Sequence, residues 1–97
     1  MFQLELSDNA LEDLKSLKKK DQVLVLDSIE KSLAHEPLSE TRQRKSLRPN
    51  PLSQWELRID RFRVFYDVDL DARVVLVKAI GWKDHNILLI RGKEFQL

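Results

Sequence analysis

The spacing of hydrophobic residues in this chain of 97 residues changes from alternating to helical and back to alternating. The segment FQLEL at 2–6 alternates and predicts a short strand. Ser7, directly after it, is a favourable helix N-cap. A first helix is expected from there, because leucines then recur at helical spacing, at Leu11, Leu14 and Leu17.

A second helix is predicted between Asp21, which can cap its start, and Pro37, which ends it. Because only a short break separates the two helices, we expect them to form an antiparallel hairpin. The apolar side of both helices is expected in the hydrophobic core. In the second helix this side consists of Val23, Leu26, Ile29 and Leu33.

Alternation returns in the second half of the chain, after a long polar loop at 36–53 that contains the three prolines. Strands with turns near 60–61 and 70–71 are predicted at 54–59, 62–69 and 73–80. The segment ILLI at 87–90 is expected to add a short strand or to cover the sheet. This order predicts an α+β fold, β-α-α-β-β-β, with the helices on one face of an antiparallel sheet.

The segment WELRIDRFRVFYDVD at 55–69 alternates almost without a break, yet it carries three arginines. A two-residue turn at 60–61 places Arg58 directly opposite Arg63 on one face of the sheet. The same turn places the apolar residues on the other face, under the helices, with Ile59 opposite Phe62, Leu57 opposite Val64 and Trp55 opposite Tyr66.

A two-residue turn at 70–71 extends this arrangement, because it places Lys78 of the next strand opposite Arg63. Lys83 follows just past the end of that strand, near the same rim. Like charges that face each other across a sheet destabilise it, so a cationic row of Arg58, Arg63 and Lys78 favours a site for an anion such as phosphate. The alternative is that ordinary surface ion pairs neutralise the row through Glu56, Asp60 and Asp67.

The distribution of charge supports a nucleic-acid contact on this face. The formal net charge of the chain is only +1, but residues 42–63 hold seven cations and two anions. Trp82 lies beside Lys83 in the sequence and offers a ring on which a base can stack; the alternative is that the ring belongs to the core. The candidate RNA contacts are therefore Arg58, Lys78, Arg61, Lys45, Arg44 and Trp82.

Three apolar residues are expected on the same face as the cationic row. Phe65, Leu76 and Ile80 would form a strip beside the row, unless they belong to the core. Such a strip fits a helix or strand of another protein.

Several classes of protein are excluded by composition. The chain has no cysteine, which rules out disulfides and thiolate metal sites, and its two histidines lack metal-binding spacing, so no metal or other cofactor is expected. The N-terminus does not look like a signal peptide, and the apolar runs are far shorter than the about 20 residues of a membrane span. We expect a cytoplasmic protein with one domain, residues 1–97, and no membrane contact.

Five segments together resemble the RelE/ParE toxin superfamily of bacterial type II toxin–antitoxin systems. They are K-x-L at 45–47, W-x-L-R at 55–58, FRVFYDVD at 62–69, VVLVKAIG at 74–81 and WKDH at 82–85. The resemblance covers essentially the whole chain. It implies a small α+β domain with two helices packed on an antiparallel sheet, and an antitoxin protein as partner in a hetero-oligomer.

The resemblance implies different activities for different branches of the superfamily. RelE-like members enter the ribosomal A site and cut mRNA without a metal, leaving a 2′,3′-cyclic phosphate. ParE-like members share the fold but poison DNA gyrase. A ribosome-dependent mRNA endonuclease is the expected function, and a gyrase inhibitor or a degenerate toxin that keeps only antitoxin binding is the alternative.

The functional residues of the superfamily carry over unevenly. Arg63 matches the arginine that stabilises the phosphoryl transition state, Arg58 a basic residue that holds RNA, and Lys83 a basic residue or histidine that acts as general acid. Glu56 stands where the best-studied branch has a lysine. Some members carry a catalytic tyrosine at a position that falls near Leu89, and no tyrosine occurs there.

Cleavage of a phosphodiester requires a base, an acid and cations. Glu56 and His85 are the candidate bases, Lys83 and His85 are the candidate acids, and the cationic row supplies the positive charge. The alternative interpretation of His85 is a surface or capping residue in a turn. The antitoxin is expected to be acidic or amphipathic and to mask Arg63.

Overall fold

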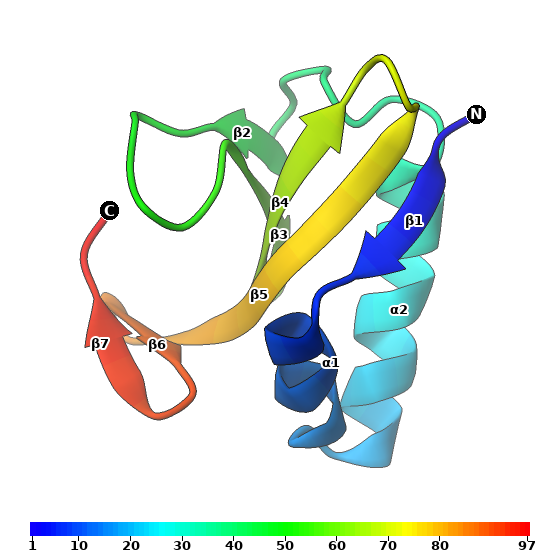
Figure 1. The fold of residues 1–97 in the computed structure, drawn as a ribbon. Coiled ribbons are helices and arrows are strands. Elements are labelled where there is room, and N and C mark those ends of the chain that lie inside the picture. The colour runs from blue at the N-terminus through cyan, green and yellow to red at the C-terminus, as the bar shows by residue number, and fades with distance from the viewer.

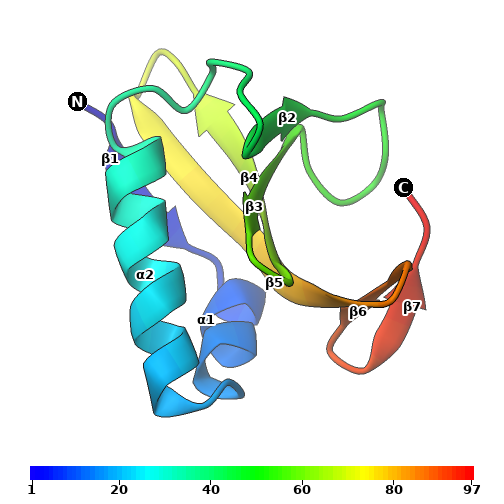
Figure 2. The same cartoon turned by 180° about the vertical axis from the view of Figure 1, so that it is seen from behind.

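The computed structural model describes residues 1–97 as a curved seven-stranded sheet with two helices against one of its faces (Figure 1 and Figure 2). The strands β2 to β7 follow one another in order, each antiparallel to its neighbours, while β1 runs parallel to β5. The elements are β1 Gln3–Leu6, α1 Asp8–Lys15, α2 Lys19–Leu33, β2 Arg44–Ser46, β3 Trp55–Ile59, β4 Phe62–Asp69, β5 Val74–Asp84, β6 Ile87–Ile90 and β7 Lys93–Phe95.

The predicted α+β fold is confirmed, because the first strand, the helical hairpin and the antiparallel strands occur in the expected order. The segment ILLI forms β6, and β5 extends beyond its predicted end to Asp84. Two short strands have no counterpart in the prediction. β2 pairs with β3 and β7 pairs with β6, because the long loop and the tail fold back onto the sheet.

Local signals account for the start of α1 but not for that of α2. The Oγ of Ser7 accepts a hydrogen bond from the N–H of Ala10 at 3.1 Å, which confirms the predicted N-cap. The prediction that Asp21 caps α2 is wrong, since the helix begins at Lys19. Asp21 lies in the first turn instead, where its negative charge interacts favourably with the helix dipole.

The predicted apolar stripe of α2 is only half correct. Ile29 and Leu33 are buried, but Val23 is 62% exposed and Leu26 is 37% exposed, while Val25 is fully buried in their place. Steps of three and four residues permit either Leu26 or Val25 before Ile29, and packing on the sheet selects Val25. Neither helix combines the length and the apolar character needed to cross a membrane.

The β3–β4 hairpin has the predicted register. Ile59 lies opposite Phe62 across a two-residue turn, in which Asp60 has a φ of 51°. Arg58 lies opposite Arg63, on the face away from the helices. The apolar residues predicted to face the helices do form the main core with them; the fully or nearly buried ones are Leu57, Ile59, Phe62, Val64 and Tyr66.

The predicted register between β4 and β5 is wrong. The connecting loop spans residues 70–73 instead of two residues, so that Asp69 pairs with Val74. Farther along, Tyr66 pairs with Val77 but Phe65 pairs with Ala79, which leaves Lys78 as the extra residue of a β-bulge. Arg63 therefore faces Gly81, and Lys78 does not join the row of arginines.

The bulge reverses which side chains of β5 point to each face. Val75 and Val77 belong to the main core before the bulge, and Ile80 belongs to it after the bulge. The predicted strip of Phe65, Leu76 and Ile80 is therefore not formed. Phe65 is fully buried in a second cluster on the opposite face, Ile80 is 2% exposed in the main core, and Leu76 is half-buried.

A second apolar cluster lies on the face away from the helices. Phe65, Ala79, Leu88 and Ile90 form it, and Leu47, Leu52 and Phe95 pack against it. The β6–β7 hairpin reaches this face because β5 bends where it leaves the main sheet (Figure 1). Gly81 permits the approach, since a Cβ atom there would lie 2.5 Å from the carbonyl oxygen of Leu89.

Candidate functional site

A cleft of about 680 Å³ opens on the face away from the helices. Its floor comes from β3, β4 and β5, and its walls come from the 45–50 segment on one side and the C-terminal strands on the other. The charged residues that line it are Lys45, Arg48, Arg58, Arg63, Lys83 and one acid, Glu56. None of these five cations belongs to an ion pair. The ion pairs of the molecule involve Lys31, Arg61, Lys78, His85 and Arg91 instead.

Arg63 is the most buried cation of the cleft, with only 8% of its surface exposed. Its Nη1 donates hydrogen bonds to the carbonyl oxygens of Asp60 and Phe62, both at 2.8 Å. Its Nε is buried and has no hydrogen-bond partner. The β3–β4 turn therefore holds the guanidinium in place through Nη1, and only the donors of Nη2 remain for a ligand in the cleft.

The electrostatic environment of Arg63 disfavours its positive charge. Burial lowers the pKa of Arg63 below its usual value, and the neighbouring Arg58 lowers it further, while Glu56 opposes the change. A buried cation without a carboxylate partner is costly for a folded protein. An oxyanion bound in the cleft would supply the missing negative charge and hydrogen-bond acceptors.

Glu56 and Lys83 flank the arginines from two different strands. Glu56 lies on β3, half-buried, opposite Lys45 of the edge strand β2. Lys83 lies on β5 two residues beyond Gly81, and its side chain is half-buried in the cleft. The cleft thus combines one carboxylate, one amine and two arginines around its floor, which is a set that can transfer protons and bind a phosphate.

The sequence matches a known toxin family over most of its length. A family model described as the ParE toxin of the type II toxin–antitoxin system, parDE, matches residues 4–86. The chain belongs to the ParE toxin family. The resemblance to RelE/ParE toxins inferred from the motifs is confirmed. No curated protein sequence matches significantly.

Solved structures of RelE toxins have the same fold as this ParE-family toxin. The toxin–antitoxin complex RelBE2 from Mycobacterium tuberculosis matches with a TM-score of 0.73 and 22% identity, over 84% of this chain and 98% of the other. The isolated RelE toxin of E. coli matches with a TM-score of 0.71 and 18% identity, over 88% of this chain and 87% of the RelE chain. The archaeal RelE–RelB complex from Pyrococcus horikoshii matches with a TM-score of 0.69 and 17% identity, over 87% and 97%.

Three predicted RNA contacts of the toxin lie outside the cleft. The Nζ of Lys78 lies 3.8 Å from the carboxylate of Asp67. Arg61 stacks over the ring of Phe62 on the helix side, with its side chain 62% exposed. Arg44 donates hydrogen bonds to backbone carbonyl oxygens at the end of α2 and in the following loop, so it fastens β2 to the helix.

Trp82 and His85 are also outside the cleft. Trp82 packs against the main core on the helix face, because consecutive residues of a strand point to opposite faces and Lys83 points into the cleft. His85 lies in the β5–β6 turn with a φ of 57°, and its Nδ1 is 3.0 Å from the carboxylate of Asp84. Its side chain is 91% exposed, which fits the interpretation as a surface residue in a turn.

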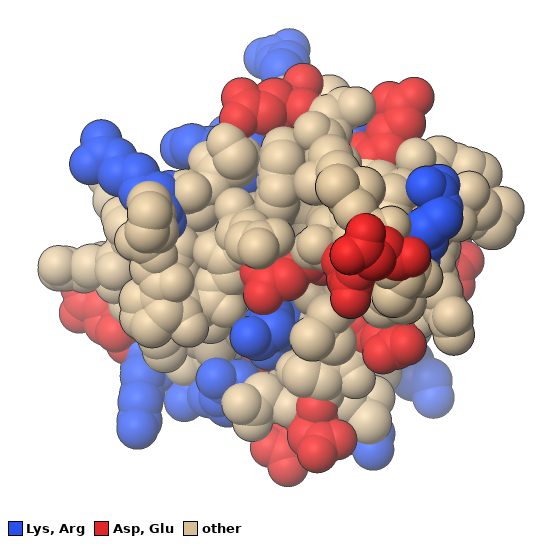
Figure 3. All heavy atoms as spheres, turned by 45° about the horizontal axis from the view of Figure 1, so that its top comes forward, with Lys and Arg blue, Asp and Glu red and all other residues tan.

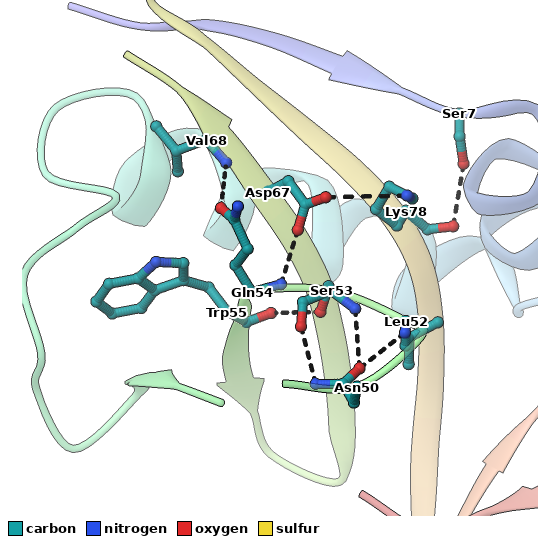
Figure 4. Close-up of polar contacts among 9 residues, drawn as sticks. All are labelled: Ser7, Asn50, Leu52, Ser53, Gln54, Trp55, Asp67, Val68 and Lys78. Carbon is teal, nitrogen blue, oxygen red and sulfur yellow. Dashed lines mark hydrogen bonds and ion pairs between the residues drawn. The ribbon is translucent and has the colours of Figure 1, made fainter. Parts of the chain in front are cut away.

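One wall of the cleft depends on residues that the sequence did not single out. Asn50 accepts hydrogen bonds from the N–H groups of Leu52 and Ser53, and its amide donates to the carbonyl oxygen of Ser53 (Figure 4). The same amide also donates to the carbonyl oxygen of Arg48. This side-chain turn fixes the segment that carries Arg48. An asparagine between two prolines was the available signal.

The positive charge of the cleft is a local feature of the toxin. On the face shown in Figure 3, acidic and basic side chains are interspersed, as expected for a chain with a net charge of +1. No group of three or more histidine, cysteine, aspartate or glutamate side chains is arranged to hold a metal ion. The ionisable side chains that line the cleft are amines, guanidiniums and the carboxylate of Glu56.

Proposed function

We propose that this toxin is a ribosome-dependent, metal-independent mRNA endonuclease that leaves a 2′,3′-cyclic phosphate. The observation that carries the proposal is the state of Arg63, a buried guanidinium whose Nη1 is held by two backbone carbonyls and which belongs to no ion pair. Such a preorganised donor stabilises charge that develops on a phosphate in the transition state. Arg58, directly opposite, adds a second cation for the same phosphate.

The proposed reaction is an internal transfer within the RNA backbone. The 2′-oxygen of one nucleotide attacks the adjacent phosphorus atom while the bond from phosphorus to the 5′-oxygen of the next nucleotide breaks. Glu56 accepts the proton of the 2′-hydroxyl, and Lys83 donates a proton to the departing 5′-oxygen. Arg63 and Arg58 bind the two non-bridging oxygens.

The ribosome is expected to supply what the cleft lacks. Five cations in a cleft of about 680 Å³ can hold one or two phosphates, but they cannot select a codon or bend the strand for in-line attack. An mRNA already bent on the ribosome brings that geometry with it. The proposed substrate is therefore the codon in the ribosomal A site.

The decisive experiment compares Arg63→Ala with the wild-type toxin on ribosomes programmed with a defined mRNA. The wild type should cut within A-site codons, and Arg63→Ala should reduce the rate by about 100-fold or more, because it removes a transition-state donor. Arg61→Ala is the matched control, since Arg61 is outside the cleft and its loss should leave cutting unchanged. Equal cutting by Arg63→Ala and the wild type would contradict the proposal.

Inhibition of DNA gyrase is the second candidate function. It is favoured by the match to a ParE family model and by the absence of the C-terminal tyrosine at Leu89. A gyrase poison would leave the mRNA intact and accumulate cleaved gyrase–DNA complexes. A degenerate toxin would do neither and would only bind its antitoxin.

We also propose a cognate antitoxin that covers the cleft with an acidic segment. Solved structures with the same fold include toxins bound to their antitoxins. Because the cleft cations have no ion-pair partners within the toxin, carboxylates of a partner would fit them. A structure of the complex in which the cleft and its exposed cation Arg58 remain open to solvent would contradict this mode of inhibition.

A further inference from the structure

Two backbone groups of β5 beside the bulge lie past the end of β1, whose last pairing is Leu6 with Val77, so no strand satisfies them on that side. Lys78 has no partner on β4, because Phe65 pairs with Ala79 and Tyr66 pairs with Val77. An extra residue in one strand interrupts the ladder of hydrogen bonds at that point. Buried backbone groups without partners are rare in folded proteins, so another element must satisfy them.

The N-cap and the last turn of α1 supply partners for the carbonyl oxygen of Lys78 and the N–H of Ile80. The Oγ of Ser7 donates a hydrogen bond to the carbonyl oxygen of Lys78 at 3.0 Å (Figure 4). The carboxylate of Asp13 accepts a hydrogen bond from the N–H of Ile80 at 3.0 Å. The two side chains come from the N-cap and the last turns of α1, so the helix spans the bulge and holds it from both sides.

Asp13 also connects the bulge to the wall of the cleft. Its side chain is 2% exposed, and its two oxygens lie 2.8 and 3.0 Å from the Nη1 of Arg91. Arg91 lies between β6 and β7, at the turn of the hairpin that forms this wall. One buried carboxylate therefore joins α1, β5 and the β6–β7 hairpin.

On the other side, the bulged residue supports the opposite wall. The Nζ of Lys78 faces one oxygen of Asp67 at 3.8 Å, while the other oxygen of Asp67 accepts the N–H of Gln54 at 2.7 Å (Figure 4). Gln54 ends the segment that Asn50 folds into the wall. Lys78 therefore braces the cleft instead of lining it.

The bulge decides which face Lys83 occupies. Val75 and Val77 point to the helices, so strict alternation would send positions 79, 81 and 83 to the helices as well. The extra residue reverses this order, and Lys83 lines the cleft with Arg63. Without the bulge, a charged side chain would point into the apolar layer under α1, and the cleft would lose one of its cations.

We propose that Ser7 and Asp13 are positioning residues of the cleft, which hold β5 in the bulged register that turns Lys83 toward Arg63. The role of Lys83 as an RNA contact in this proposal rests on the proposed function. The bulge and its two anchors do not, so they can be tested in the free protein.

The register is read directly by NMR in the uncomplexed toxin. In the wild type, cross-strand contacts should join Arg63 to Gly81, and the amide of Ile80 should be protected from hydrogen exchange. Loss of the bulge would move Arg63 opposite Ile80. In Asp13→Ala we expect the Arg63–Gly81 contact to weaken and the protection of Ile80 to fall.

Ser7 variants separate the bulge from the helix cap. Ser7→Thr keeps the hydroxyl that donates to Lys78 and should behave as the wild type. Ser7→Asp keeps a good N-cap but has no proton to donate, so α1 should persist while the register at Arg63 shifts. These variants also decide the question if Asp13→Ala does not fold.

Binding of a short single-stranded oligouridylate provides the functional measurement. Lys83→Ala should make the slope of log affinity against log salt shallower by about 0.7, which is the contribution of one phosphate contact on a single strand. Ser7→Asp and Asp13→Ala should each reduce the steepness of this slope by the same amount. In a protein that already carries Lys83→Ala, neither substitution should reduce the steepness further. Asp27→Ala, which removes a carboxylate from a surface pair on α2, should not change it.

The outcomes distinguish this proposal from the proposed function. A toxin that cuts no mRNA but shows the register shift in both variants refutes the endonuclease and supports the positioning role. Wild-type cross-strand contacts in Ser7→Asp and Asp13→Ala overturn the positioning role, whatever the toxin does to mRNA. The positioning role is also overturned if Ser7→Asp and Asp13→Ala reduce the steepness of the salt slope equally in the presence and in the absence of Lys83.

Discussion

Single polar atoms in this toxin have their partners far away in the sequence. Tyr66 is fully buried, its ring stacks on Trp55 with 6.2 Å between the centroids, and its hydroxyl donates to the carbonyl oxygen of Pro37 at 2.7 Å. The bond closes the long loop onto the core. Burial raises the pKa of Tyr66 well above its ordinary value, although the nearby Arg44 opposes the change.

We predict that Tyr66→Phe lowers the free energy of unfolding by about 1–2 kcal/mol, because it leaves the Pro37 carbonyl without a partner. The loss should depend on pH. Since the folded state keeps the Tyr66 proton above pH 10 and the unfolded state releases it there, the stability contributed by Tyr66 is complete below pH 10 and declines above it. Urea unfolding should show that the free energies of unfolding of the wild type and Tyr66→Phe lie closer together at about pH 11 than at about pH 8. A constant difference would contradict this account.

At the scale of elements, β5 organises the molecule. It pairs with β4 over residues 74–82, with β1 in its first half and with β6 over its last residues. The bulge at Lys78 and the close approach at Gly81 let one strand serve the main core and then the cleft. The β6–β7 hairpin can cover the second face only because position 81 has no side chain.

Gly81→Ala should therefore displace the hairpin and damage the cleft. The added methyl group would meet the Leu89 carbonyl oxygen at 2.5 Å and a side-chain carbon of Ile90 at 2.7 Å. We expect a loss of about 1–3 kcal/mol in the free energy of unfolding, as for other overpacked sites, together with weaker RNA binding.

Gly92→Ala is the matched control for this substitution. Gly92 has a φ of +75° but open space around it, so alanine there adds backbone strain without a clash. Its thermal stability should fall while RNA binding stays at the wild-type level. Equal binding by both variants would show that the hairpin position does not matter for the cleft.

At the scale of the whole molecule, charge is balanced overall and concentrated in one place. The net charge of +1 gives no strong field around the toxin, whereas the cleft holds five unpaired cations around Glu56. Binding of a nucleic acid should therefore depend on the cleft and respond strongly to salt.

We predict that the logarithm of the affinity for single-stranded RNA falls linearly with the logarithm of the salt concentration. The slope should be no steeper than about −3.5, because five phosphate contacts contribute about 0.7 each. Binding titrations at salt concentrations between about 50 and 200 mM would measure this slope. Arg58→Ala should reduce the slope by about 0.7, and Arg73→Ala, which removes a cation stacked on Phe2 outside the cleft, should leave it unchanged. A slope unaffected by Arg58→Ala would contradict binding in the cleft.

The sequence by itself determined the parts of this protein that depend on local periodicity. Alternation and helical spacing predicted the α+β order, and the two-residue turn at 60–61 permits one register, so Arg58 could be placed opposite Arg63. The cap at Ser7 was also readable, because the hydrogen bond spans three residues. Of the cleft residues, Arg63, Arg58, Lys83, Glu56 and Lys45 had been singled out.

The tertiary structure decided the rest, because the causes lie far apart in the chain. The bulge at Lys78 depends on Ser7 and Asp13, which are 71 and 67 residues from the groups they satisfy. Alternation within β5 carries no sign of those partners, so sequence reasoning placed Lys78 in the row and Ile80 on the wrong face. Periodicity assigns the two faces of a strand, but only distant contacts reveal where the strand changes face.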